Sequence, residues 1–385
     1  MTTARRAVAV SFFLNGLAFA SWASRIPDVR HTLGLSDQAL GLLLLGLSLG
    51  SVLALPLSGA LVHRFGPAAV VRGGCVAVGV ALVGIAVGVS GVGLVRATVP
   101  FLFCYGIGTS VWDVAMNVEG ADVERRLGRS IMPRFHAAFS LGTVAGAGLG
   151  ALMAHLGPDV TPHLVGIAVV AAAGNLVAAS RFLPAAEGPA EPSVGSRGAW
   201  REPRTLMIGL VVLVMALTEG TANDWLAVAI KDGYDVAGSV AVLGFALFVS
   251  AMTLGRMVGP ALLDRAGRVP VLFGTIVLAG VGVLLTVFGS TPWLVVPGIA
   301  LWGLGASLGF PVGMSAAADD HAHAAARVGV VSTIGYTAFL AGPPLLGFVA
   351  SEVGTLRALL IVAVLLLPAF LVIPALAPRP PARTV

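Results

Sequence analysis

Charged residues are scarce in this chain. Asp, Glu, Lys and Arg make up 11% of the 385 residues, whereas 57% are hydrophobic. An average soluble domain carries about 25% charged residues, so this composition cannot supply the polar surface of a water-soluble fold. We therefore expect a membrane protein that crosses the bilayer many times.

Lysine and cysteine are almost absent. The single lysine, Lys231, follows Ile230, so it cannot belong to a G-x-x-x-x-G-K-[ST] phosphate loop. Cys75 and Cys104 both fall in apolar runs, which argues against a disulfide framework and a thiolate metal site. Twelve spans of about 22 residues would also leave no room for a soluble nucleotide domain. These features exclude an ATP-driven pump, so any transport must use another gradient.

Long apolar runs that end at charged, Pro or Gly clusters predict an all-α membrane protein with twelve transmembrane helices. The expected spans are 7–27, 38–62, 70–90, 97–121, 133–155, 161–183, 205–230, 238–262, 270–289, 292–315, 328–350 and 355–376. The longest connection, 184–204, is rich in Pro, Gly, Ser and Glu, which is typical of a flexible linker. We expect two six-helix bundles, residues 1–183 and 205–376, and a tail at 377–385.

The basic residues fall mainly on one side of these spans. With the N-terminus inside, eighteen of the 23 Lys and Arg residues are on the inner side, a count that places Arg256 with the inner loops. Cytoplasmic loops carry such an excess, so both termini should be cytoplasmic in a multi-pass protein of the plasma (inner) membrane. The net charge of +5 then reflects topology rather than a nucleic-acid partner.

Three short segments of the first half recur in the same order in the second half. They pair GALVHRFG at 59–66 with PALLDRAG at 260–267, YGIGTS at 105–110 with WGLGAS at 302–307, and Asn15-Gly16 with Glu219-Gly220. The echoes predict duplicated halves in parallel orientation. Transporters built in this way bind their solute near the bilayer midplane, where the halves meet.

The first of these segments resembles the G-x-L-x-D-R-x-G-[RK] signature of the major facilitator superfamily, and the resemblance covers the whole chain. In that family the acid of the signature helps to hold the two halves together in one gate state. The resemblance therefore implies gating roles for Gly59, His63, Arg64, Gly66, Asp264, Arg265, Gly267 and Arg268. His63 occupies the acid's place, so the first-half contact should be weaker or pH-dependent, unless His63 is only a solvated loop residue.

A second resemblance is to fucose-permease-like carriers. The segment Asp113-Val-Ala-Met-Asn117 is similar to their acid-x-x-x-Asn segment, whose acid takes part in proton coupling. This implies a carrier that moves a sugar or related polar metabolite with protons by alternating access. Proton-driven efflux of hydrophobic compounds is the alternative, and a non-transporting membrane sensor is a more remote one.

A carboxylate inside an apolar span indicates a function, because inserting it at the bilayer centre costs about 2.5–3.5 kcal/mol of free energy on insertion scales. We expect Asp113 and Glu219 to carry the coupled protons; the competing interpretation is that each acid pairs with a nearby Arg or caps a broken helix. Spacing of four residues puts Asn117 on the face of Asp113 and Asn223 on the face of Glu219. The expected solute contacts are Asn15, Trp112, Asn117, Asn223, Asp224 and Trp302.

Gly142, Gly146 and Gly150 recur every four residues in the fifth predicted span. Small residues at this spacing allow helices to approach closely in lipid. The pattern predicts a tightly packed helix face.

Enzyme and metal sites are not expected. G-x-S-x-G occurs at 46–50 and 305–309, but both matches lie inside apolar helices and lack the strand that a hydrolase requires. The cluster of Asp319, Asp320, His321 and His323 lacks the further ligands of a metal site. The expected partners are a small solute, protons and the lipid bilayer, without cofactor or nucleic acid, and the chain is expected to act as a monomer.

Overall fold

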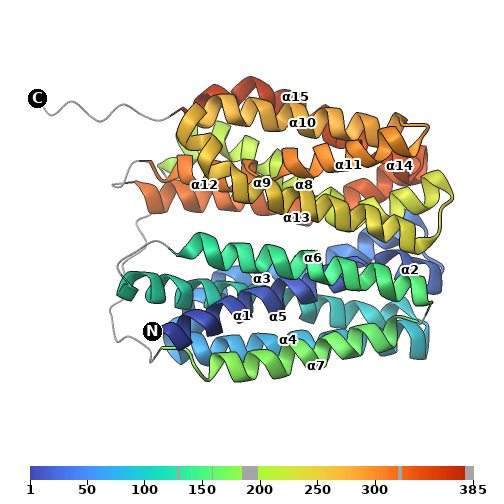
Figure 1. Cartoon of the computed structure of the whole chain (residues 1–385), viewed down its shortest axis with the longest axis horizontal. Coiled ribbons are helices and arrows are strands. Elements are labelled where there is room, and N and C mark those ends of the chain that lie inside the picture. The colour runs from blue at the N-terminus through green and yellow to red at the C-terminus, as the bar shows by residue number, and fades with distance from the viewer. Residues whose placement is uncertain (128–130, 158, 184–197, 320–322, 378–385) are drawn as a thin grey trace, which may run out of the picture. The chain divides into compact units, whose positions relative to one another are not determined.

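The structure is a computed structural model that describes residues 1–127, 131–157, 159–183, 198–319 and 323–377. These residues are almost entirely helical (Figure 1). The first part of the chain forms α1 (Thr2–Ala23), α2 (Ile26–Thr32), α3 (Asp37–Phe65), α4 (Pro67–Ala86), η1 (Val87–Val92), α5 (Val95–Leu127), α6 (Met132–Leu156) and α7 (Val160–Ala179). The rest forms η2 (Ala199–Arg201), α8 (Pro203–Tyr234), α9 (Gly238–Ala266), α10 (Arg268–Phe288), α11 (Pro292–Ala306), α12 (Gly309–Ala317), α13 (Ala324–Val353), α14 (Thr355–Ala358), α15 (Leu360–Val372) and η3 (Ile373–Leu376).

Among the described residues, 12 helices are long and apolar enough to cross a membrane, which confirms the predicted number. Some are built from two or more elements in series: α1 with α2, α4 with η1, and α11 with α12. Most of the predicted linker, 184–197, and the tail residues 378–385 lie outside the described residues.

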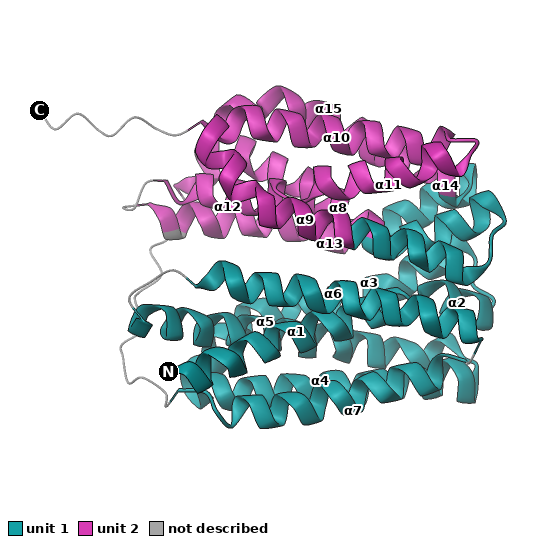
Figure 2. Ribbon diagram, viewed as in Figure 1, with its two compact units in different colours: residues 1–190, 223–249, 343–355 teal, residues 191–222, 250–342, 356–385 magenta. Residues whose placement is uncertain are grey.

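The chain divides into two compact units (Figure 2). Unit 1 contains residues 1–190, 223–249 and 343–355, and unit 2 contains residues 191–222, 250–342 and 356–385. The long helices α8, α9 and α13 therefore contribute residues to both units.

In unit 1, α1 and α6 pack closely through glycine. A Cβ atom added at Gly142 would lie 2.0 Å from the Phe13 carbonyl oxygen, and one at Gly146 would lie 2.6 Å from the Leu17 carbonyl oxygen. A Cβ at Gly150 would lie 1.9 Å from Ser24 Oγ. All three glycines thus face α1, which confirms the packing role predicted from their spacing.

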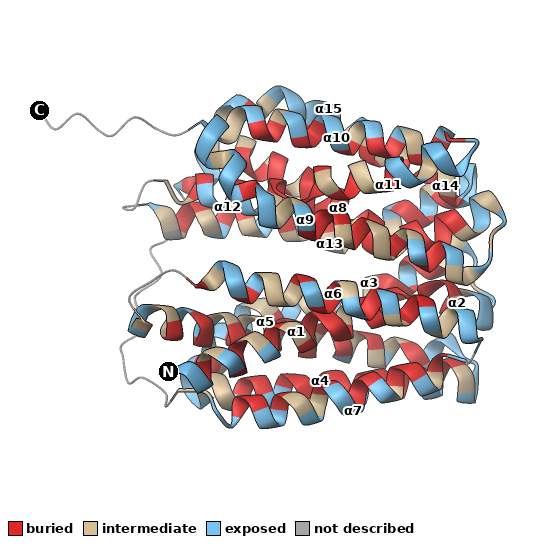
Figure 3. Ribbon diagram, viewed as in Figure 1, coloured by how far each residue is buried: buried red, intermediate tan, exposed pale blue. Residues whose placement is uncertain are grey.

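Large apolar side chains remain exposed on the outward faces of the helices, where Figure 3 shows bands of exposed residues beside buried ones. Examples are Leu53 and Leu57 on α3 and Leu367 and Leu371 on α15. Exposed apolar faces of this extent are expected where lipid replaces water as the solvent.

The repeated motif marks the ends of two helices. Gly66 caps α3 with φ 78° and Gly267 precedes α10 with φ 81°, a backbone conformation that only glycine adopts without strain. The next helix begins at once in both places, at Pro67 and Arg268. Both copies of the motif therefore place a glycine at the same point and form the same tight turn between two helices.

Candidate functional site

Unit 1 holds a carboxylate with an amide neighbour near the middle of a long helix. Asp113 lies about 21 Å from the end of α5 at Leu127, at the usual helical rise. Asn117 Nδ2 donates to the Asp113 carbonyl oxygen at 2.9 Å and lies 3.4 Å from Asp113 Oδ1. The two side chains share one face of α5, as their spacing predicts. No cation is recorded against the Asp113 carboxylate within the described part of the chain.

Trp112 has a different environment from its neighbour Asp113. Its side chain is fully buried, and its indole Nε1 donates to Ser11 Oγ on α1 at 2.9 Å. Its backbone and Cβ lie against Gly74 of α4. Trp112 therefore helps to hold α1 and α4 to α5.

Asn15 on α1 and Asn223 on α8 are buried amides of unit 1. Asn15 Nδ2 and Asn223 Oδ1 find no hydrogen-bond partner among the residues that the structure describes. Asp224, the next residue on α8, is half-buried and forms no ion pair with any of them. Buried polar groups are nearly always hydrogen-bonded, so Asn15 and Asn223 retain the capacity to bind a polar ligand.

Unit 2 places Glu219 against a cation that the sequence analysis assigned to the inner loops. Arg256 lies inside α9, about 15 Å before its end at Ala266. Its Nη2 donates to Glu219 Oε1 at 2.9 Å and to Oε2 at 2.8 Å, and its Nε donates to the Ser307 carbonyl oxygen at 3.4 Å. The assignment of Arg256 to the inner loops was wrong, because the predicted span 238–262 already contained it and α9 places it inside the helix.

Two aromatic side chains of unit 2 contact the residues on either side of Glu219 in sequence. Trp302 on α11 is fully buried, and its Nε1 donates to the Thr218 carbonyl oxygen at 3.3 Å. The Phe339 ring on α13 lies against Gly220. The Glu219 stretch of α8 is thus flanked by α9, α11 and α13.

The residues expected to act in gating are mostly exposed. His63 and Arg64 are exposed at the end of α3, and Asp264 and Arg265 are exposed at the end of α9. Gly59, four residues before His63, would meet no neighbour within 4 Å if it carried a Cβ atom.

Arg268 differs from the other gating candidates because it is part of an ion-pair network. Its Nη1 contacts Asp319 Oδ1 at 2.6 Å, and Arg204 Nη2 contacts Asp319 Oδ2 at 3.0 Å. Arg204 also donates to the carbonyl oxygens of Ala375 and Ala377. Asp319 therefore joins α8 to α10, and Arg204 joins α8 to residues 375–377, all within unit 2. Asp320 and His321, which follow Asp319 in the sequence cluster, lie outside the described residues.

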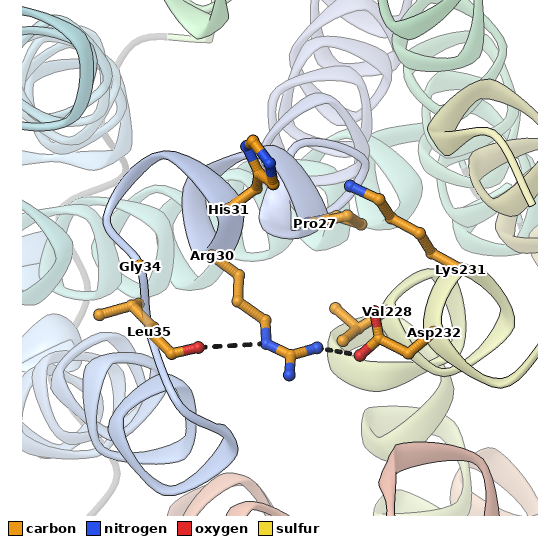
Figure 4. A pocket seen from close by; sticks show the side chains of 8 residues that line it. All are labelled: Pro27, Arg30, His31, Gly34, Leu35, Val228, Lys231 and Asp232. Carbon is orange, nitrogen blue, oxygen red and sulfur yellow. Dashed lines mark hydrogen bonds and ion pairs between the residues drawn. The ribbon is translucent and has the colours of Figure 1, made fainter. Parts of the chain in front are cut away.

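Arg30 connects three helices at the end of unit 1 that the charge pattern predicts to be extracellular (Figure 4). It pairs with Asp37 of α3 at 2.5 Å, pairs with Asp232 of α8, and donates to the Leu35 carbonyl oxygen. Asp232 is also within 3.5 Å of Thr355 Oγ1. Arg30, Leu35 and Asp232 line a cavity of about 270 Å³ together with Lys231.

Arg30→Gln is expected to loosen this end of unit 1, because two ion pairs are lost together. Val228 lines the cavity and is almost fully buried, so a Val228→Cys probe in a background with Cys75 and Cys104 replaced by Ala reports on opening. A membrane-impermeant thiol reagent added outside should label it roughly fivefold faster, since partly exposed ion pairs contribute up to about 1 kcal/mol.

The matched control is Arg96→Gln, because Arg96 is exposed and forms no ion pair within the described part of the chain. An equal increase in both variants, or none in Arg30→Gln, would show that Arg30 does not close this end.

Comparison with known proteins agrees with this architecture. The family model of the major facilitator superfamily matches residues 8–218 and 208–385. An uncharacterised MFS-type transporter of Yersinia pestis is 33% identical over 349 residues, which cover 89% of this chain and 87% of the relative. The membrane protein MosC of Rhizobium meliloti is 30% identical over 363 residues, which cover 92% of this chain and 86% of the relative.

Solved structures show the same fold at low sequence identity. A variant of the nucleoside transporter NupG superposes with a TM-score of 0.82 at 15% identity, covering 97% of this chain and 99% of that one. The human organic anion transporter MFSD10 superposes with a TM-score of 0.70 at 18% identity, covering 97% and 99%. Twelve helices that are long and apolar enough to span a membrane in the described part of the chain, a repeated signature motif and a family match over almost the whole sequence lead to one conclusion: this chain belongs to the major facilitator superfamily, and it is a secondary transporter rather than an enzyme.

Proposed function

We propose that this transporter moves a small polar metabolite together with protons. The observation that carries the proposal is Asp113, a carboxylate near the middle of α5 that has an amide neighbour and no recorded cation among the described residues. Water-poor surroundings favour the protonated form of a carboxylate, and access to water favours its ionised form. Alternate exposure to the two sides of a membrane would therefore load and release a proton at this position.

The proposed carrier works by rocking two six-helix bundles, residues 1–183 and 205–376, about a shared polar pocket. Glu219 is the second proposed proton carrier, and the signature-motif residues near His63 and Asp264 are the proposed gates. We place the carrier in the plasma membrane as a monomer.

Several observations support a polar solute. Asn15, Asn117 and Asn223 offer amide groups inside apolar spans, and amides bind hydroxyl and carbonyl groups. The structural neighbours are named as carriers of nucleosides and of organic anions. The resemblance to fucose-permease-like carriers favours a sugar or a sugar derivative within this class.

Proton flux into proteoliposomes tests the proposal. With purified protein, a pH dye in the lumen and no imposed gradient, a transported polar solute added outside should acidify the lumen, because solute and proton enter together. A panel of sugars, sugar acids and nucleosides should contain at least one such solute, and protein-free liposomes are the control.

Two results would contradict it. If hydrophobic compounds alone change the luminal pH, and their entry makes the lumen alkaline, the carrier is an exchanger for efflux. If a polar solute enters without any pH change, transport is not coupled to protons.

A further inference from the structure

The Arg256–Glu219 pair is difficult to explain as a stabilising element. An arginine at the centre of a membrane helix costs about 2.5–3.5 kcal/mol on insertion scales, and a buried ion pair is often no more stable than a packed apolar pair. Glu219 lies about 22 Å or more from either end of α8, so the pair is deep in the span. Its presence there calls for a functional reason.

The geometry leaves part of the guanidinium unused. Both hydrogen bonds to the Glu219 carboxylate come from Arg256 Nη2, and Nε contacts the Ser307 carbonyl oxygen. Arg256 Nη1 makes no hydrogen bond to any residue within the described ranges. The side chains of Arg256 and Glu219 are 27% and 18% exposed, so neither side chain is fully enclosed by the protein.

An arginine binds a carboxylate most strongly through two parallel N–H groups. The edge formed by Arg256 Nη1 and Nη2 can offer this arrangement only if Glu219 gives up Nη2. Protonation of Glu219 removes its negative charge and weakens its hold on the guanidinium. The contact of Nε with Ser307 would still hold Arg256 in place.

We propose that Arg256 is the residue that determines solute specificity, and that it binds the carboxylate of a hydrophilic organic acid. The solute carboxylate replaces Glu219 on the guanidinium, and Glu219 takes up one proton. The negative charge of the solute thus replaces that of Glu219, and the net charge of the site stays the same. This assignment rests on the proposed transport function and deepens it by naming the solute class.

Few charged groups compete with this exchange. Arg256 from α9 is the only ionisable side chain recorded against Glu219 among the described residues. Trp302 of α11 and Phe339 of α13 also flank this stretch of α8, and neither titrates. The ring of Tyr336, which can ionise, lies 6.4 Å from that of Phe339. A pH effect on binding that disappears in Glu219→Gln is therefore assigned to Glu219.

Calorimetry with hydrophilic probes tests the proposal. Gluconate and glucuronate are the carboxylate probes, and sorbitol and glucose are their neutral counterparts. Wild-type protein should bind each carboxylate at least about tenfold more tightly than its counterpart, in line with hydrogen bonds to charged groups. Affinity should fall as pH rises, and proton uptake on binding should be about one.

Two variants isolate the pair. Glu219→Gln removes the competing charge, so carboxylate binding should lose its pH dependence and take up about one proton less. The double variant Glu219→Gln/Arg256→Gln leaves no uncompensated charge, so it should fold, and it should bind carboxylates no better than neutral probes. Arg357→Gln is the control, because Arg357 is exposed and has no ion pair in the described part of the chain.

The proposal is overturned if the wild type shows no preference for either carboxylate at any pH, or if the double variant keeps that preference. Failure of this proposal can be distinguished from failure of the transport proposal. Carboxylate binding without proton flux in proteoliposomes would remove the transport proposal alone, whereas proton-coupled uptake of neutral solutes alone would remove this one.

Discussion

Replacing Asp113 by Asn is expected to abolish proton-driven accumulation of solute while exchange of solute across the membrane continues. Asn keeps the size of the side chain and its contact with Asn117, but it cannot carry a proton. A carrier that alternates without loading a proton can equilibrate its solute, and it cannot use a pH gradient to concentrate it.

Two assays on the same proteoliposomes measure this effect. With an inwardly directed proton gradient, wild-type vesicles should accumulate solute above the outside concentration, and Asp113→Asn vesicles should only reach it. Counterflow of labelled against unlabelled solute should persist in the variant. Unchanged accumulation would remove Asp113 from the coupling mechanism.

Asp235→Asn is the matched control for Asp113→Asn. Asp235 is exposed between α8 and α9 and has φ 50°, a conformation that Asn tolerates well. The same chemical change at this position should leave both accumulation and counterflow as in the wild type.

Gly142→Ala is expected to destabilise the protein strongly, although it adds only one methyl group. The added methyl group would lie 2.0 Å from the Phe13 carbonyl oxygen and 2.9 Å from the Phe13 carbonyl carbon. Both atoms belong to the backbone of α1, so no side chain can rotate away and the two helices must separate. Overpacking of this kind costs about 1–3 kcal/mol in free energy of unfolding.

Gly148 provides a control on the same helix. A Cβ atom at Gly148 would meet nothing within 4 Å, and Ala is a better helix former than Gly. Thermal unfolding in detergent should give a lower apparent midpoint for Gly142→Ala and an unchanged or higher one for Gly148→Ala. Equal loss in both variants would mean that the α1–α6 contact is not the cause.

The number of spans and the position of the signature motif at helix ends could be predicted from the sequence, because both depend on local physical properties. Length and hydropathy alone decide whether a helix can cross a bilayer, and the glycine that turns the chain between α3 and α4 needs no distant partner. The same holds for the glycine face of α6, since the four-residue spacing already defines one side of a helix.

The charged contacts between helices could not be predicted in the same way. Arg256 and Glu219 are separated by 37 residues, and Arg30 and Asp232 by 202. An ion pair between two helices depends on how those helices face each other, and no spacing rule along one helix contains that information. The sequence allows Glu219 to pair with an arginine, but only the structure identifies Arg256 as that partner.

The amino-acid sequence by itself determined that twelve helices of the described chain are long and apolar enough to cross a membrane, because the cost of polar groups in lipid acts on each segment separately. It also determined where the helices turn and which faces are small enough to pack. Only the tertiary structure decided that Arg256 holds Glu219, that Asp113 stands without a recorded cation in the described part of the chain, and that Arg30 joins α2, α3 and α8. Charge–charge interactions depend on distance in space, and distance in space is fixed by helix packing.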